Sequence, residues 1–339
     1  MVTVRIQKLM KQAKHAYFID SPTDLLYLTK MELSKGRLLM GPNEAILFVD
    51  GRYFEKAKQH APCTVALWDE QKKLSKNQIG FDSDTVTYSG YLALKKAFPN
   101  VEWTPMPSPL KALRMVKDED EITALKKAAD LTWRGYKKII ECLKEGVSEE
   151  ELAVEFKVFC LKNGASAFSF EPIIAFGENS AYPHYRAGNV RLKKDQVVLI
   201  DIGAVVNCYH ADMTRIHYFG KPNPKIERFE RIVKAAKQKA IAHVRPGVKV
   251  GTLDEIVRAE FEKEGVKQLY THSLGHGVGL ETHEAPKVHF SGEDKDLLLE
   301  PGMVFTIEPG LYEPGVGGVR LEDMIVVTET GHENFFKQG

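Results

Sequence analysis

The chain has 339 residues, of which 43% are hydrophobic and 27% charged, values typical of a globular protein of about two domains. Its 47 Lys and Arg residues nearly balance 46 Asp and Glu residues, so no overall field attracts it to nucleic acid or to a membrane. The start lacks a signal-peptide pattern, no apolar run could span a membrane, and the four cysteines form no CxxC pair; a cytoplasmic location is therefore expected.

Residues 1–112 predict a small α/β domain. Apolar runs at 16–19 and 45–49 predict buried strands, and Asp50-Gly51 predicts a turn before a helix that begins near Tyr53. The proline-rich stretch 104–109 forbids a helix, so we place the domain boundary just after it, between domains 1–112 and 113–339.

The sequence of the second domain predicts two similar pairs of helices. The first pair begins at Asp118 and at Ser148, which with Glu151 forms a capping box, and its helices end at Gly146 and Gly164. A buried stripe is expected on the first helix at Ile122, Leu125, Ala129, Trp133, Tyr136, Ile140 and Leu143.

The second pair repeats this plan. It spans about 223–243 and a shorter helix that ends at Gly265, with Thr252 and Glu255 as its expected cap. Gly247 and Gly265 follow Gly146 and Gly164 by 101 residues (247 − 146 and 265 − 164). The recurrence indicates an internal duplication whose two halves face each other across a cleft; chance recurrence of common helix caps is the alternative.

Each half ends in strand-rich sequence that carries acids. If Val206-Asn207 is a two-residue turn, Asp201 lies directly opposite Asp212. A five-residue loop over 313–317 likewise places Glu308 opposite Glu322. Carboxylates held this close in an apolar setting repel unless protons or cations neutralise them. Four of them would be balanced by about two divalent cations, whereas isolated surface acids would need none.

A histidine-rich stretch, 271–284, separates the two acid pairs. A glycine-rich loop with histidines is weak evidence alone, but here it offers a nitrogen ligand and catalytic donors. Oxygen ligands with one imidazole suit Mn²⁺, Co²⁺ or Zn²⁺, and the selection among them stays open. The glycines match no phosphate-binding pattern, because no P-loop lysine follows them.

Taken in order, these segments resemble the creatinase/prolidase/methionine aminopeptidase family over nearly the whole chain. The resemblance implies an α+β fold, with a "pita-bread" catalytic domain of internal pseudo-two-fold symmetry at 113–339. Residues 1–112 resemble the N-terminal domain of proline-specific members, which methionine aminopeptidases lack. The motifs that carry it are Asp201, Asp212-Met213-Thr214-Arg215, Gly275-His276-Gly277, Glu308-Pro309-Gly310 and Arg320-Leu321-Glu322-Asp323.

The resemblance also assigns residue roles. It implies that two divalent metal ions are bound by Asp201, Asp212, His276, Glu308 and Glu322. It places His184, His272 and His283 at the substrate and transition state, and Arg320 beside the cluster as a supporting charge. It further implies a homodimer. His210 departs from the family pattern, and no function is attached to it.

The expected activity is hydrolysis of the Xaa-Pro bond in short proline-containing peptides. Two cations would lower the pKa of a bridging water from about 15.7 towards about 7, with Glu308 as the proton shuttle. The motifs do not separate a dipeptidase (prolidase) from an aminopeptidase P that takes longer peptides, although the short step from Glu308 to Glu322 favours the dipeptidase. The chain could instead be a non-catalytic peptide-binding module or a metal-independent enzyme like creatinase. The native metal and the preferred residue before proline stay open.

Overall fold

The computed structural model describes residues 4–73 and 78–336. The chain divides into two compact units, Met1–Arg114 and Met115–Gly339. The division falls close to the position expected from the proline-rich stretch. Within the described ranges, no helix combines the length and apolar character that crossing a membrane requires.

The N-terminal unit is a mixed sheet with helices around it. The strand order is β4-β3-β2-β1-β5-β6, and the two strands expected from the sequence are present as β1 and β3. The proline-rich stretch is in part a strand, because β6 lies at the sheet edge, where proline's missing N–H costs no ladder bond. The elements are α1 Val4–Gln12, β1 Ala16–Ile19, α2 Pro22–Thr29, β2 Gly36–Met40, β3 Ala45–Val49, α3 Phe54–His60, β4 Thr64–Leu67, η1 Trp68–Lys73, β5 Gln78–Asp82, α4 Tyr88–Ala97, β6 Glu102–Met106 and α5 Leu110–Met115.

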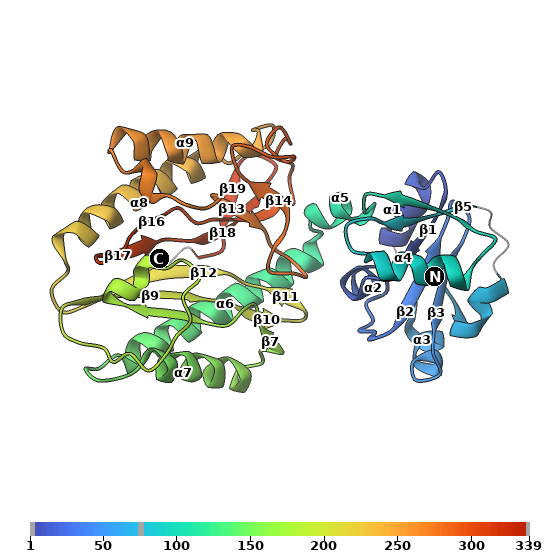
Figure 1. The fold of residues 1–339 in the computed structure, drawn as a ribbon, viewed down its shortest axis with the longest axis horizontal. Coiled ribbons are helices and arrows are strands. Elements are labelled where there is room, and N and C mark those ends of the chain that lie inside the picture. Colours follow the sequence, from blue (N-terminus) through green and yellow to red (C-terminus); the bar gives the residue numbers. More distant parts are fainter. Residues whose placement is uncertain (1–3, 74–77, 337–339) are drawn as a thin grey trace. The chain divides into compact units, whose positions relative to one another are not determined.

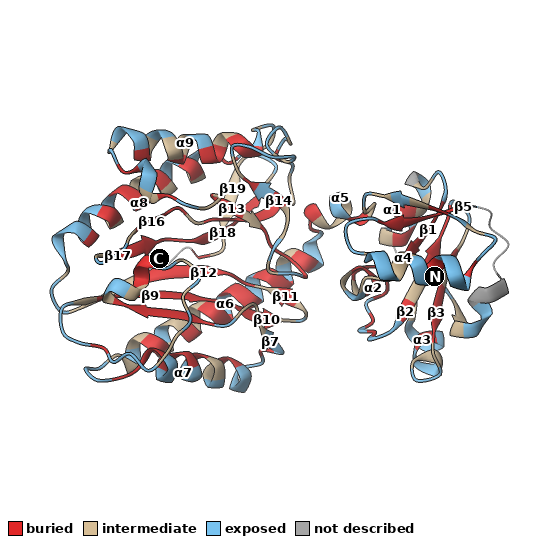
Figure 2. Cartoon of the chain, in the orientation of Figure 1, coloured by how far each residue is buried: buried red, intermediate tan, exposed pale blue. Residues whose placement is uncertain are grey.

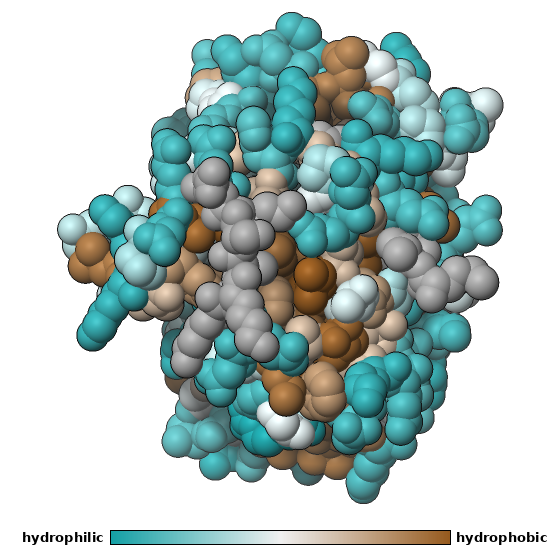
Figure 3. All heavy atoms as spheres, turned by 90° about the vertical axis from the view of Figure 1, so that its right-hand side faces the viewer, coloured by the Kyte–Doolittle hydropathy of each residue, from teal (hydrophilic) through white to brown (hydrophobic). Residues whose placement is uncertain are grey.

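One face of this unit carries hydrophobic side chains near its centre, with hydrophilic ones around them (Figure 3). Helix α4 exposes two large hydrophobic residues, Tyr88 at 76% and Leu92 at 48%. Exposed hydrophobic surface is typical of a contact face. The expected homodimer stays a prediction.

The C-terminal unit has strands between two pairs of helices (Figure 1). The pair α6 and α7 lies on one outer side of the strands, and α8 and α9 lie on the other. Their bounds are α6 Glu119–Cys142, α7 Glu149–Lys162, α8 Pro224–Ala242 and α9 Val250–Lys263. This is the two-sided architecture that the sequence predicts for the second domain.

The helix ends confirm most of the expected caps. Asp118 and Ser148 both form complete capping boxes, and Asn223 caps α8. The cap expected at Thr252 is wrong: α9 begins at Val250 after Lys249, whose side chain makes no capping bond. Backbone bonds from Val250 and Gly251 to Leu297 and Lys295 satisfy that helix end instead.

The two halves match in detail where the duplication was inferred. Gly146 and Gly247 both have φ +83°, a left-handed conformation that favours glycine. Their N–H groups donate to the carbonyls of Leu192 and Leu299, each at 2.9 Å. The same turn therefore joins the two helices of each pair.

The buried face of α6 differs from the expected stripe. Leu125 and Ala129 are buried, but Ile122, Trp133, Tyr136, Ile140 and Leu143 are only partly so. The buried face instead includes Ala128, Thr132 and Gly135. A Cβ on Gly135 would lie 2.6 Å from the Phe156 ring of α7. Small residues face inward because the neighbouring elements pack closely there, and the large side chains lie at the edges of the contact.

The strands of this unit form the buried centre between the helix pairs (Figure 2). Two sheets hold the site: β12-β9-β8 in the first half and β14-β13-β15-β18-β19 in the second. The remaining elements are β7 Ala167–Phe168, β8 Ile173–Phe176, η2 Gly177–Ala181, β9 Gln196–Ile202, β10 Ala204–Val206, β11 Tyr209–His210, β12 Met213–Phe219, η3 Lys267–Leu269, β13 Gly275–Gly277, β14 Glu284–Val288, β15 Val304–Ile307, β16 Gly310–Glu313, β17 Gly317–Arg320, β18 Asp323–Val327 and β19 His332–Asn334.

Candidate metal centre

The first acid-bearing hairpin has a different register from the expected one. Val206 pairs with Tyr209, and Asp201 therefore lies opposite Thr214 rather than Asp212. The turn residues are Asn207 and Cys208, with φ +52° and +68°. A two-residue hairpin turn of this kind needs positive φ at both positions, which β-branched Val206 resists and asparagine accepts.

The second hairpin has the expected register. Gly310 pairs with Arg320 on one side and Ile307 pairs with Asp323 on the other, so positions 308 and 322 oppose each other between these ladders. The ladder continues one pair further than expected, to Glu313 and Gly317. The connecting loop is correspondingly shorter than five residues.

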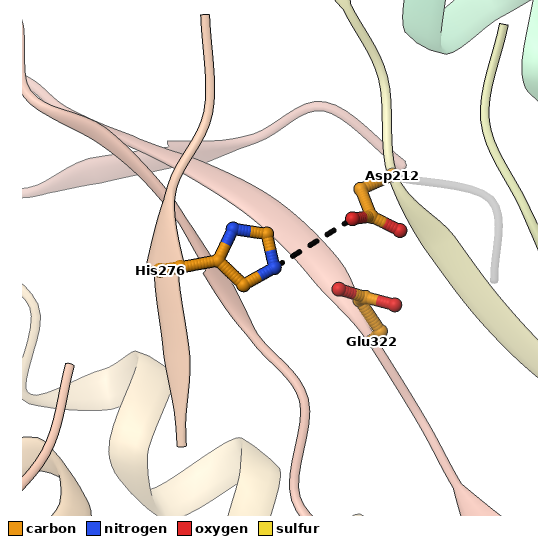
Figure 4. Close-up of side chains that lie close together, drawn as sticks. All are labelled: Asp212, His276 and Glu322. Carbon is orange, nitrogen blue, oxygen red and sulfur yellow. Dashed lines mark ion pairs between the residues drawn. The ribbon is translucent and has the colours of Figure 1, made fainter. Parts of the chain in front are cut away.

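Three of the expected ligands converge within coordination distance of one another. One ligand atom each from Asp212, His276 and Glu322 lies within 4.8 Å of the other two (Figure 4). His276 Nε2 is 3.7 Å from Asp212 Oδ2 and 3.4 Å from Glu308 Oε1. Asp201 joins them in the wall of one cavity of about 630 Å³. The shifted register still leaves both aspartates at this cavity.

His276 is held in the form that binds metals. Its Nδ1 is 3.0 Å from the carbonyl of Gly277, and a carbonyl can only accept, so Nδ1 carries the proton and Nε2 faces the carboxylates. The glycines beside it allow close approach of neighbouring strands. A Cβ on Gly275 would lie 2.0 Å from Thr306 O, and one on Gly277 2.1 Å from Ala285 O.

The carboxylates are buried and repel one another. The pKa values of Asp212 and Glu308 are raised well above their usual values. Burial is the largest cause, and the charge of Glu322 is the second. Burial, and after it the charge of Asp201 as the second-largest cause, raises the pKa of Glu322 to about 7. Burial, followed by His283, lowers the pKa of His276 to about 4, so its imidazole is neutral at pH 7.

This donor set fits divalent cations. Asp201 Oδ1 is buried and has no hydrogen-bond partner within the described part of the chain, as expected for an oxygen reserved for a cation. Carboxylate oxygens with one neutral imidazole suit Mn²⁺, Co²⁺ or Zn²⁺. The residues at the cavity therefore fit a divalent cation, without selecting one.

A buried network behind the carboxylates was only partly anticipated. Arg320 donates to Asp201 Oδ2 at 2.5 Å, to Thr214 Oγ1 at 3.1 Å and to the Tyr312 hydroxyl at 2.8 Å. Thr214 in turn donates to Glu322 Oε2 at 2.7 Å. Sequence reasoning expected Arg320 but gave no role to Thr214 or Tyr312. The correct hairpin register would have identified Thr214, because it places that residue opposite Asp201.

The three other expected histidines all line the cavity, in different states. Both ring nitrogens of His272 have protein partners: Nδ1 lies 2.8 Å from Ser273 O, and Nε2 lies 2.9 Å from the Tyr312 hydroxyl. His283 packs against His276 with ring centroids 4.2 Å apart, and His184 is exposed to the cavity. A charge on His184 would lower the pKa of both His272 and His283, which places the histidines close together.

His272 gives the metal-free protein a pH-dependent stability. Burial is the largest cause, and the positive charge of Arg320 the second, that lowers the pKa of His272 to about 4. In an unfolded chain this pKa is about 6.5. Between these values the unfolded chain binds a proton that the folded protein does not. Stability is therefore present above pH 6.5 and is lost as pH falls towards 4, by up to roughly 3 kcal/mol.

A His272→Gln variant is expected to lack this contribution. Urea unfolding of both chelator-treated proteins between pH 4.5 and 7 measures it, and the free energy of unfolding should rise less steeply with pH in the variant. Equal slopes would contradict a His272 that is neutral in the folded protein.

Comparison with known proteins agrees with this site and fold. Residues 123–329 match the model of metallopeptidase family M24, and residues 4–116 match the creatinase/prolidase N-terminal domain. A Xaa-Pro dipeptidase of Pyrococcus furiosus is 34% identical over 98% of this chain and 97% of its own length. The structure resembles a Xaa-Pro dipeptidase from Bacillus anthracis (TM-score 0.92, 33% identity, covering 99% of this chain and 96% of that one). It also resembles an X-Pro aminopeptidase from Thermotoga maritima (TM-score 0.90, 30% identity, 98% of each chain).

The fold and the site together define a metal-dependent peptidase with a pita-bread catalytic domain. The chain belongs to metallopeptidase family M24 and carries the creatinase/prolidase N-terminal domain.

Proposed function

We propose that the protein hydrolyses the Xaa-Pro bond at the N-terminus of dipeptides and short peptides. The observation that carries the proposal is the convergence of five candidate metal ligands and three histidines on one cavity. The similarity to Xaa-Pro dipeptidases over nearly the whole chain supports the specificity for proline. Intact ligands speak against a non-catalytic peptide-binding module and against a metal-independent enzyme.

The metal-binding residues would be Asp201, Asp212, His276, Glu308 and Glu322, with Mn²⁺ the preferred ion. Two bound divalent cations would acidify a water molecule and polarise the scissile carbonyl.

Glu308 would accept the proton of the attacking water and pass it to the leaving nitrogen. Its carboxylate borders the cavity, and Thr306 Oγ1 donates to it at 3.4 Å. His283 and His184 would donate hydrogen bonds to the developing oxyanion. Arg320 holds Asp201 and offsets part of the buried negative charge.

Two basic side chains on the cavity wall favour short substrates. Arg186 and Lys287 line the cavity, and neither has an ion-pair partner among the residues that the structure describes. In a dipeptide the proline carboxylate lies one residue from the scissile bond. A pair of basic side chains is the natural partner for this carboxylate. A longer peptide has an amide at that position. We therefore propose that the protein is a dipeptidase, with an aminopeptidase P activity as the alternative.

Kinetics on matched peptides test this assignment. We expect Ala-Pro to be cleaved with at least about tenfold higher kcat/KM than Ala-Pro-NH₂ or Ala-Pro-Ala, because a charge-assisted hydrogen bond contributes about 1.5–3 kcal/mol. Lys287→Met and Arg186→Met should raise KM for Ala-Pro by roughly 10–100-fold and leave Ala-Pro-NH₂ nearly unchanged. Lys295→Met, outside the cavity lining, is the control. Comparable rates on Ala-Pro and Ala-Pro-Ala would identify an aminopeptidase P.

A further inference from the structure

Glu149, the first residue of α7, is an acid that the proposed mechanism does not use. It is fully buried, at 0% exposure. The hydrogen-bond partners of its carboxylate are uncharged, and within the described part of the chain no lysine or arginine forms an ion pair with it. A buried carboxylate is tolerated only when it is fully hydrogen-bonded. Its place at a helix N-terminus also favours negative charge.

All hydrogen bonds to this carboxylate come from one segment of the chain, 176–188. That segment runs from the end of β8 through η2 into an irregular stretch. The donors to Oε1 are Phe176 N at 2.9 Å and Asn179 Nδ2 at 2.9 Å, and the donors to Oε2 are the Tyr185 hydroxyl at 2.8 Å and Gly188 N at 3.3 Å.

The backbone of α7 contacts the same region. Glu149 N and Glu150 N donate to the carbonyls of Val190 and Gly188, at 3.2 and 3.0 Å. Asn179 Nδ2 also bonds to the Tyr185 hydroxyl at 2.8 Å. The first turn of α7 therefore fixes both ends of a stretch that has no regular secondary structure of its own between 182 and 190.

His184 lies in the middle of this stretch. It has no regular strand or helix to orient it, and it lines the cavity directly before Tyr185, which also lines it. His184 is therefore the direct neighbour of a residue whose hydroxyl is bonded to Glu149.

We propose that Glu149 is a positioning residue that acts through Tyr185 to present His184 to the substrate. The inference rests on the proposed function for the role of His184. Burial raises the pKa of the Tyr185 hydroxyl to about 12, with the Glu149 hydrogen bond adding to it, so the phenol stays a donor throughout the working pH range.

The second half of the unit contains a comparable arrangement. Asp254, in the first half of α9, is also fully buried and binds Arg258 Nε at 2.9 Å. Arg258 Nη2 donates to the carbonyl of His272 at 3.1 Å. In each half, a buried acid on the second helix thus holds a segment that carries a cavity histidine.

Substitution of the acid tests the proposal. In Glu149→Gln an amide nitrogen at the Oε2 position cannot accept, so Gly188 N loses its partner and the Tyr185 hydroxyl can no longer donate to this side chain. We expect kcat on Ala-Pro to fall roughly 10–100-fold with little change in metal content, because small displacements of a catalytic group are costly. Tyr185→Phe removes the hydroxyl that donates to Glu149 and accepts from Asn179, and it should cause a loss in the same direction. Glu150→Gln is the matched control: it removes an exposed charge from the same helix turn and should stay within about twofold of wild type.

A double-mutant cycle separates positioning from general damage. If Glu149 acts through His184, adding Glu149→Gln to His184→Ala should cost at most about twofold more activity. A full additional loss in that background would overturn the proposal.

A spectroscopic measurement makes the result independent of activity. The NMR resonances of the His184 ring in chelator-treated protein should shift or broaden in Glu149→Gln and stay unchanged in Glu150→Gln. An unchanged His184 resonance in Glu149→Gln would overturn the inference even if activity falls. Wild-type protein that cleaves no Xaa-Pro peptide would instead refute the proposed function, and the NMR comparison would still decide the positioning role.

Discussion

A Glu308→Gln variant is expected to cleave Ala-Pro about 10²–10⁴-fold more slowly than wild type, the range that general acid–base catalysis contributes. The glutamine keeps the size of the side chain and its oxygen at the cavity, but it cannot take a proton from water or return one to the leaving nitrogen. The loss should appear mainly in kcat, since the group acts in the transition state rather than in substrate binding.

Metal content must be measured in the same samples, because Glu308 is also an expected ligand. Its Oε1 lies 3.4 Å from His276 Nε2, so the variant can lose metal as well as the proton acceptor. Single-turnover rates at saturating Mn²⁺ isolate the chemical step. A metal-loaded variant within about tenfold of wild type would exclude Glu308 as the proton shuttle.

Removal of divalent cations is expected to abolish activity and to lower the stability of the C-terminal unit. In the metal-free protein, burial and mutual repulsion raise the pKa of Asp212, Glu308 and Glu322, which is the physical sign of an uncompensated anionic site. Cations that bind only the folded state stabilise it by mass action. At a Mn²⁺ concentration of about 1,000 Kd the gain is about 4 kcal/mol.

Thermal unfolding with and without Mn²⁺, after chelation and dialysis, measures this effect. Glu322→Gln serves as the matched variant, because it keeps the volume at the site and removes one charge that faces Asp212. We expect the variant to lose most of the Mn²⁺-dependent increase in Tm. An equal increase in wild type and variant would mean that the ions bind elsewhere. Peptidase activity indifferent to chelation would favour a metal-independent enzyme.

The two hairpins illustrate how far local sequence can be taken. For the Glu308–Glu322 hairpin, strand residues and turn glycines left one workable register, and that register is correct. For the other hairpin, asparagine could occupy either turn position. The structure selects Asn207-Cys208, because this choice spares β-branched Val206 a positive φ. The prediction of converging acids survived the shift because both aspartates still reach the cavity.

The helices illustrate a second limit. The capping box of Ser148 and Glu151 depends on residues three apart and was readable from the sequence. The helix start at Asp118 was readable too, and the structure adds a capping box there. The start of α9 was not, because its first N–H groups donate to the carbonyls of Lys295 and Leu297 without any side-chain cap. The inward face of α6 was likewise missed, since the close approach of Phe156 requires glycine at 135.

The sequence by itself determined the strands and helix pairs, the domain order and the chemical types of the site residues. These depend on interactions between residues near one another in the chain, and on side chains whose chemistry is the same in any fold. Tertiary structure alone decided how that chemistry is arranged. Thr214 and Tyr312 join Arg320, and Glu149 reaches the segment around His184, only because packing brings distant parts of the chain together and desolvates their polar groups. Burial is a property of the assembled fold, so the pKa shifts that it causes could not be read from the sequence.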